Sequence, residues 1–213
     1  YFLYRPGAVE KNLRLSVLNA ANQVVATSDG FSDDVNDYVA KFHATGLQPS
    51  TSYTYRIDDL SSGSPVQIVG PSDGLRFKTF APVGSKGVVT VAFMSCANST
   101  SEPVWQRMGE LAVNQVILGG DTPYNDVVDL PTFRSKHRAF LETSFMRSLI
   151  RSTSSVGTWD DHDFGLNNGN GVNAADRRDN RTGCCVRSVP PRWRRGAGRL
   201  PAHGPRAECH QHR

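Results

Sequence analysis

Short stretches of alternating apolar and polar residues fill the first 80 residues of the chain. Alternation with a period of two is typical of strands with one buried face, and Gly, Asp, Asn, Ser or Pro bounds each stretch. The expected strands are residues 14–18, 23–27, 38–44, 51–57, 65–69 and 75–80. Short strands at this spacing predict an all-β sandwich rather than alternating strands and helices.

One of these stretches has the pattern of a tyrosine corner. Leu47 and Pro49 come just before the strand at 51–57, which Tyr53 enters. In such a corner the tyrosine hydroxyl binds backbone a few residues upstream. Residues 1–81 accordingly resemble a fibronectin type III-like module. Its expected role is structural, with a ligand-binding β surface as the alternative.

The hydrophobic pattern changes after the Gly- and Pro-containing linker at 81–87. Residues 88–94 form a nearly continuous apolar run, which is typical of a strand covered on both faces. Further strands are expected at 114–118 and 156–159. These runs predict a second part of the chain with a different architecture.

Two helices are expected between these three strands. The first should begin at Ser101-Glu102-Pro103, and its predicted apolar stripe is Val104, Trp105, Met108, Leu111 and Ala112. Asp129 is expected to cap the second helix, with Pro131 in the first turn and apolar residues at helical spacing as far as Leu149. This β-α-β-α-β order predicts a parallel sheet with helices packed on it.

Residues with chemically active side chains follow each of the three strands, in the stretches 95–98, 119–126 and 159–163. Ligands of open α/β sheets bind beyond the carboxyl ends of the strands. Carboxylates gathered there repel one another and lose hydration, so a shared cation is the natural way to hold them. A thiolate, a phenol and carboxylates suit trivalent iron, whereas carboxylate and carbonyl oxygens alone suit Ca²⁺ or Mg²⁺.

The motifs Ser95-Cys96, Gly120-Asp121-x-x-Tyr124 and Trp159-Asp160-Asp161-His162-Asp163 resemble, in order and spacing, those of the PhoD-like (alkaline phosphatase D type) metallophosphatases. The resemblance covers roughly residues 1–176. It implies a β-sandwich at 1–81 followed by a truncated α/β metallophosphatase domain at 88–176, so this is the predicted fold class.

The resemblance also implies a role for each site residue. Cys96 and Tyr124 are expected to bind iron, Asp121 to bridge two metals, and Asp161 to bind the second metal in place of the usual Asn. His162 is the expected catalytic residue and faces the phosphoryl oxygens. The implied cofactors are iron and calcium, with other divalent metals left open.

The implied reaction is hydrolysis of small phosphomonoesters or phosphodiesters by a metal-activated water. The resemblance further implies export to the periplasm or the medium, although the chain shows no signal peptide at its start. No apolar run approaches the roughly 20 residues of a membrane span. The sequence does not predict an oligomeric state.

Each site residue also has a plainer interpretation. Cys96 alone would more often be a small buried hydrophobic residue, and Tyr124 a packed aromatic residue. Asp160, Asp161 and Asp163 could form the turn before the following glycine-rich loop. Four consecutive ionisable residues after an apolar strand favour a bound ion over a turn alone.

The net charge of +4 is the sum of two unlike parts of the chain. Residues 177–213 carry ten Arg and a charge of +8, whereas the preceding residues carry −4. With so few large aliphatic residues, this Arg-rich tail is expected to be disordered. The tail is interpreted as a basic nucleic-acid-binding arm, a divergent terminus or the product of a shifted reading frame. The first has little support, because Trp193 is the aromatic residue of the tail that could stack on bases. The last is favoured, because a shifted frame of a GC-rich gene gives a sequence rich in Arg, Pro, Gly and Ala without Lys, Ile, Phe or Tyr, as found here.

The later Asp and His ligands of a metallophosphatase are not recognisable in the tail, so the activity of this chain as given is left open. The alternative function is that of a non-catalytic binding protein, whose β module or basic tail engages a partner. Salt-dependent nucleic-acid binding lost on removal of the tail would favour that alternative.

Overall fold

The structure is a computed structural model that describes residues 1–98 and 102–169. The predicted disordered tail at 177–213 lies outside the described residues. The elements of the first part are β1 (Phe2–Tyr4), β2 (Lys11–Leu18), β3 (Val24–Ser32), β4 (Ala40–Phe42), β5 (Ser52–Asp59), β6 (Val66–Val69), the short 3-10 helix η1 (Pro71–Asp73) and β7 (Arg76–Lys78).

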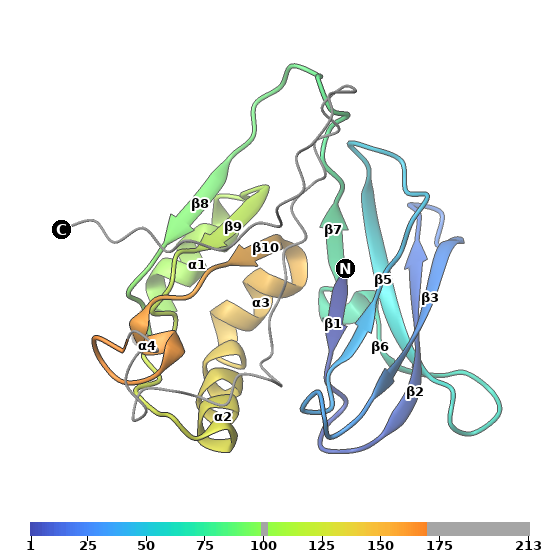
Figure 1. Cartoon of the computed structure of the whole chain (residues 1–213). Coiled ribbons are helices and arrows are strands. Elements are labelled where there is room, and N and C mark those ends of the chain that lie inside the picture. The colour runs from blue at the N-terminus through green and yellow to red at the C-terminus, as the bar shows by residue number, and fades with distance from the viewer. Residues whose placement is uncertain (99–101, 170–213) are drawn as a thin grey trace, which may run out of the picture.

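These strands form two antiparallel sheets (Figure 1). The larger has the order β3-β2-β5-β6, with β7 also paired to β5, and the smaller joins β1 to β4. Alternate residues of the strands turn inward, as expected from the period of two. Their common core consists of Leu13, Leu15, Val17, Ala40, Phe42, Tyr53 and Ile57. The predicted β-rich character of this part is therefore confirmed.

The expected tyrosine corner is present. The hydroxyl of Tyr53 accepts a 3.0 Å hydrogen bond from the backbone N–H of Gln48. This bond ties the loop before β5 to the start of that strand. The neighbouring Tyr55 instead donates to the carbonyl of Arg151, at 3.2 Å, in the second part of the chain.

The second part contains the three predicted strands in parallel. The elements are β8 (Val91–Met94), α1 (Glu102–Glu110), β9 (Gln115–Leu118), α2 (Leu130–Leu141), α3 (Ser144–Ser152), β10 (Ser154–Gly157) and α4 (Asp161–Phe164). β9 lies between β8 and β10 and is parallel to both. Because all three strands run the same way, their carboxyl ends share one edge of the sheet.

The predicted second helix is two helices, α2 and α3. Asp129 caps α2 as expected, since its side chain accepts a 2.9 Å hydrogen bond from Thr132 N–H. The helix ends where Thr143 adopts an extended conformation and its hydroxyl binds the carbonyl of Phe140. Thr143 then lies directly before α3. The apolar residues keep helical spacing across this break, which is why the spacing predicted one continuous helix.

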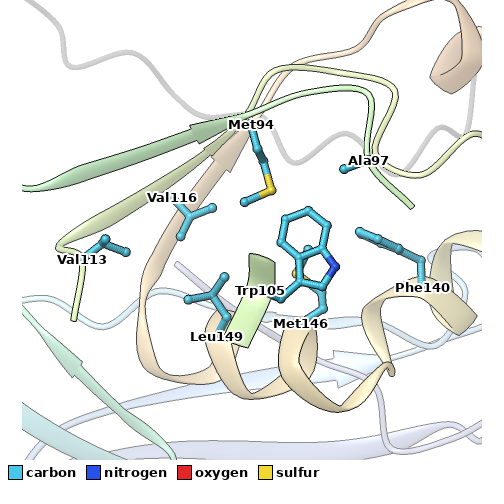
Figure 2. Close-up of a cluster of buried hydrophobic side chains, with 8 residues drawn as sticks. All are labelled: Met94, Ala97, Trp105, Val113, Val116, Phe140, Met146 and Leu149. Carbon is cyan, nitrogen blue, oxygen red and sulfur yellow. The ribbon is translucent and has the colours of Figure 1, made fainter. Parts of the chain in front are cut away.

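A second core lies under the parallel sheet (Figure 2). Trp105 of α1 is almost fully buried and meets the ring of Phe140 edge to face, with centroids 5.9 Å apart. Three predicted members of the apolar stripe, Val104, Leu111 and Ala112, are exposed instead, and the last two lie beyond the end of α1. The helix is only nine residues long, and its contacts with α3 bury a narrower stripe centred on Trp105.

The prediction that the first parallel strand is covered on both faces is wrong. Ala92 and Met94 pack toward the helices, whereas Val91 and Phe93 are exposed, Phe93 by 66%. The cause is that the core formed with α1, α2 and α3 lies on one face of the sheet.

The two parts of the chain contact one another through α2 and α3, which lie between the parallel sheet and the β-rich part (Figure 1). The carboxylate of Asp37 pairs with Arg138 of α2 at 2.5 Å and with Arg5 at 3.7 Å. Arg134 of α2 also donates to the carbonyl of Val35 at 3.2 Å. None of the helices in residues 1–98 and 102–169 has the length and apolar character needed to cross a membrane.

Candidate metal centre

Backbone hydrogen bonds hold side by side the residues that directly follow the three parallel strands, here called the strand exits. Cys96 N–H donates to the carbonyl of Gly120 at 3.1 Å, and Ala97 N–H to the carbonyl of Asp121 at 3.0 Å. On the other side, Thr158 N–H donates to the carbonyl of Leu118 at 2.9 Å. The ladder therefore continues past the strand ends and sets the three motifs against one another.

Gly120 allows the second and third exits to touch. Its φ is +100°, and a Cβ atom placed there would lie 2.7 Å from Asp160 Cβ and 2.8 Å from Asp160 N. Such distances are well inside ordinary contact distances, so only a residue without a side chain fits.

Asp121, Asp161 and His162 form the centre of the site. Each offers one ligand atom, and these atoms all lie within 4.8 Å of one another. Asp121 is 6% exposed, and the other two residues are half-buried. One oxygen of Asp121 accepts a 3.2 Å hydrogen bond from His162 N–H, while Asp161 accepts one from the backbone N–H of Asn168.

Cys96 and Tyr124 join the same cluster. The Sγ atom of Cys96 lies 3.9 Å from an Asp121 carboxylate oxygen, and Cys96 also shares a hydrogen bond with Tyr124. The Tyr124 ring meets the His162 ring edge to face, with centroids 4.5 Å apart. Cys96 is exposed, so the plainer interpretation of it as a buried hydrophobic residue is wrong.

Two acidic groups of the cluster are held in their protonated form more readily than usual. Burial raises the pKa of the Asp121 carboxyl, and the charges of Asp160 and Asp161 add to this effect. The hydrogen bond with Cys96, followed by desolvation, raises the pKa of Tyr124 to about 12. A cation placed among these groups would favour their ionised forms and reverse both shifts.

Asp126 is a site residue to which the sequence assigned no role. Its carboxylate binds Nδ1 of His162. Burial lowers the pKa of His162, but the hydrogen bond and charge of Asp126, together with the charges of Asp121 and Asp161, outweigh it, so that the pKa is raised overall. Asp126 lies in the stretch after the second strand, but its spacing does not show that the loop turns back toward His162.

Asp160 and Asp163 have structural roles, as the turn interpretation suggested. Asp160 caps α4 by accepting from Asp161 N–H at 2.9 Å. Asp163 is buried and accepts from Asp160 N–H at 3.1 Å and from Asp121 N–H at 2.6 Å. The acidic run is therefore divided, since Asp161 faces the cluster while its neighbours fix the backbone.

Four residues of the site have left-handed backbone conformations, which are uncommon for residues with a side chain. They are Cys96, Asp121, Asp126 and Asn168, with φ between 51° and 61°. Each such residue costs about 1–3 kcal/mol and persists only where surrounding contacts enforce it, and such strain gathers at functional sites. Backbone hydrogen bonds hold Cys96 and Asp121. His162 binds the side chain of Asp126, and Asp161 binds the backbone of Asn168.

The donor set fits a metal ion. Carboxylate oxygens, an imidazole and a thiol converge at one edge of a sheet, and two of the acidic groups are destabilised in their ionised forms. Carboxylate, imidazole and thiolate together suit a transition metal, and carboxylates alone suit a hard divalent cation. A groove of about 420 Å³ between the two parts of the chain contains none of these residues.

The sequence matches no known protein-family profile and no curated protein. In structure, the chain is similar to a solved structure of PhoD, with a TM-score of 0.60 and 19% sequence identity. The similarity covers 75% of this chain but 34% of the PhoD chain, so the described chain spans about a third of that protein. The likeness supports a PhoD-like fold.

Proposed function

We propose that the chain is a metal-dependent phosphoesterase of the alkaline phosphatase D type that hydrolyses small phosphomonoesters or phosphodiesters. The observation that carries the proposal is the convergence of ligand atoms from Asp121, Asp161 and His162 within 4.8 Å at the carboxyl edge of a parallel sheet. The PhoD-like fold supports the same class of reaction.

Two sets of metal ligands would share Asp121. The thiol of Cys96, which lies 3.9 Å from an Asp121 oxygen, and the phenol of Tyr124, which shares a hydrogen bond with Cys96, would hold iron. Asp161, whose ligand atom lies within 4.8 Å of that of Asp121, would hold calcium or another divalent cation. Bound metals would supply Lewis acidity and a nucleophilic water with a pKa near 7.

His162 would act on the phosphate ester itself. Its Nδ1 atom is bound to Asp126, which leaves Nε2 for a phosphoryl oxygen or the leaving group. The raised pKa of His162 increases the fraction of imidazolium that can donate a proton. A positioned acid of this kind typically contributes about 10²–10⁴-fold to the rate.

The same proposal gives each part of the chain its own role. Residues 1–81 would form a fibronectin III-like structural module and residues 88–176 the catalytic part of a truncated α/β metallophosphatase domain. Export to the periplasm or the medium accompanies this assignment, as the resemblance to the family implied.

The direct test is metal analysis and turnover with the purified full chain. Iron and calcium are each added to chelator-treated protein, and hydrolysis of p-nitrophenyl phosphate and bis-p-nitrophenyl phosphate is followed. Metal binding at the site with metal-dependent turnover is expected. A chain that binds neither metal and hydrolyses neither ester, while folded, would contradict the proposal.

Two variants make the test specific to the site. Asp121→Asn keeps the shape of the shared ligand but removes its charge, and should abolish metal binding and most turnover. Asp34→Asn makes the same change at an exposed position in the β-rich part and should leave both unaltered. Equal turnover in the two variants would exclude Asp121 from the reaction.

A further inference from the structure

We infer that Asp126 is a positioning residue that fixes the orientation and the tautomer of His162. The inference rests on the proposed function for its catalytic consequence, but the orientation of the ring can be measured without turnover.

Three contacts hold the His162 imidazole and its backbone. Asp126 binds Nδ1, Tyr124 packs edge to face against the ring at 4.5 Å, and Asp121 accepts from the backbone N–H at 3.2 Å. All three partners come from one loop, residues 121–126, whereas His162 belongs to α4. Residues of the loop after β9 thus fix the position of His162, which comes after β10 in the chain.

The contact with Asp126 determines which ring nitrogen is available. A carboxylate only accepts hydrogen bonds, so the proton of a neutral imidazole bound to it must be on Nδ1. Nε2 is then the unprotonated ring nitrogen, which can accept a hydrogen bond or bind a cation. Carboxylate partners of this kind orient catalytic and metal-binding imidazoles generally.

The structure favours a positioning role over a purely structural one. The Asp126 side chain is 45% exposed, so its removal leaves no cavity in either core. Its backbone is in the left-handed region, with φ of 51°. An aspartate that is exposed, has a left-handed backbone and is bound to a half-buried imidazole contributes chiefly through that contact.

The backbone conformation also selects the test variants. Asp126→Gly removes the carboxylate and tolerates positive φ, so it deletes the contact without adding strain. Asp126→Asn keeps the shape of the side chain and is suited to the left-handed region, but its amide N–H can donate to Nδ1 and so favour the tautomer protonated on Nε2. This variant therefore separates the carboxylate's control of the tautomer from the shape of the side chain.

The primary experiment records the ¹⁵N chemical shifts of the His162 ring in the metal-free full chain, labelled at histidine. The signals are assigned by their loss in His162→Gln, and the pH is alkaline so that imidazole is neutral. The wild type should carry the proton on Nδ1, and Asp126→Gly should change to a mixture of tautomers. Asp126→Asn should move the proton toward Nε2, and the distant Asp34→Asn should match the wild type.

Turnover provides the second readout. In Asp126→Gly, kcat should fall by about 10–100-fold with KM nearly unchanged. Asp126→Asn should not recover this loss, because its amide favours the other tautomer. In a His162→Gln background, Asp126→Gly should have no further effect, because the ring that it positions is gone.

The two proposals fail in different ways. If the wild type shows no turnover, the proposed function fails, while the ring shifts still decide the role of Asp126. A wild-type ring protonated on Nε2, or an unchanged tautomer in Asp126→Gly, would overturn the inference even in an active enzyme.

Discussion

The side chain of Asp163 accepts a 2.6 Å hydrogen bond from the backbone N–H of Asp121, 42 residues earlier in the chain. Asp163 is 5% exposed and also binds Asp160 N–H. One buried carboxylate thus joins the loop after β9 to the loop after β10. The spacing between Asp121 and Asp161 depends on this connection.

The first prediction concerns that connection. Asp163→Ala leaves two backbone N–H groups without their acceptor, so the free energy of unfolding should fall by about 1–3 kcal/mol. Metal affinity should fall as well, because the loops that carry Asp121 and Asp161 are no longer joined. Urea unfolding and calcium or iron titration measure the two effects. A variant with wild-type stability and affinity would show that the connection is dispensable.

The second prediction uses two glycines with similar backbones. Gly120→Ala places a Cβ atom 2.7 Å from Asp160 Cβ, and should both destabilise the chain and weaken metal binding. Gly63→Ala also meets a positive φ, of +80°, but no atom lies within 4 Å. Gly63→Ala should therefore show the backbone cost alone, typically about 1 kcal/mol, with unchanged metal affinity. Comparable metal affinities in the two variants would contradict the role given to Gly120.

The third prediction is a pH dependence of stability that originates far from the site. The hydrogen bond from Lys11, supported by Ser61, lowers the pKa of Asp59 to about 2. The unfolded chain has the ordinary value near 4, so this stabilisation is present above pH 4 and is lost as the pH falls toward 2. Thermal unfolding should show that Asp59→Asn is less stable than the wild type at pH 6. The difference should shrink to nothing near pH 2, and a constant difference would refute the assignment.

The fourth prediction concerns the contact between the two parts of the chain. A double-mutant cycle with Asp37→Ala and Arg138→Ala should give a coupling toward the upper end of about 0.2–1 kcal/mol, because both side chains are partly buried. Asp37→Ala should cost more than Arg138→Ala, since it also removes the 3.7 Å ion pair with Arg5 and places Ala at a φ of 54°. Strictly additive free energies of unfolding would show that the pair makes no net contribution.

The fifth prediction follows from linkage between metal binding and folding. Saturating metal at about 100 times its dissociation constant should stabilise the folded chain by about 2.7 kcal/mol. Asp121→Asn should lose this increase. Without metal, the variant should be at least as stable as the wild type, because burial disfavours the ionised carboxylate of Asp121 that the variant lacks. Thermal unfolding with and without chelator measures both. An equal increase in the variant would place the metal elsewhere.

Much of this arrangement could be predicted from periodicity alone. The alternation at 14–18, with Leu15 and Val17 turned inward, predicts a half-buried strand, and the three apolar runs with helices between them predict a parallel sheet. Parallel strands end at one edge, so the meeting of Cys96 with Asp121 follows from their positions just past two strands. These features depend on local pattern and on a general rule of topology.

The remainder depends on the paths of loops, which local pattern does not encode. Asp126 reaches His162 because the loop turns back through left-handed residues at Asp121 and Asp126. In the same way, helical spacing did not reveal that Thr143 separates α2 from α3. The exposed face of β8 was missed because an apolar run has the same composition whether one or both faces are covered.

The contacts of α2 limit how freely this protein can be rearranged by engineering. The helix follows directly from the loop that carries Tyr124 and Asp126, and its Lys136 donates to the carbonyl of Asn125 in that loop at 2.6 Å. Its other side is held by the turn that contains Asp37. An exchange of the β-rich part for another would remove the contacts on that side of α2. The β-rich part therefore supports the loop that carries Tyr124 and Asp126 and is not an interchangeable module.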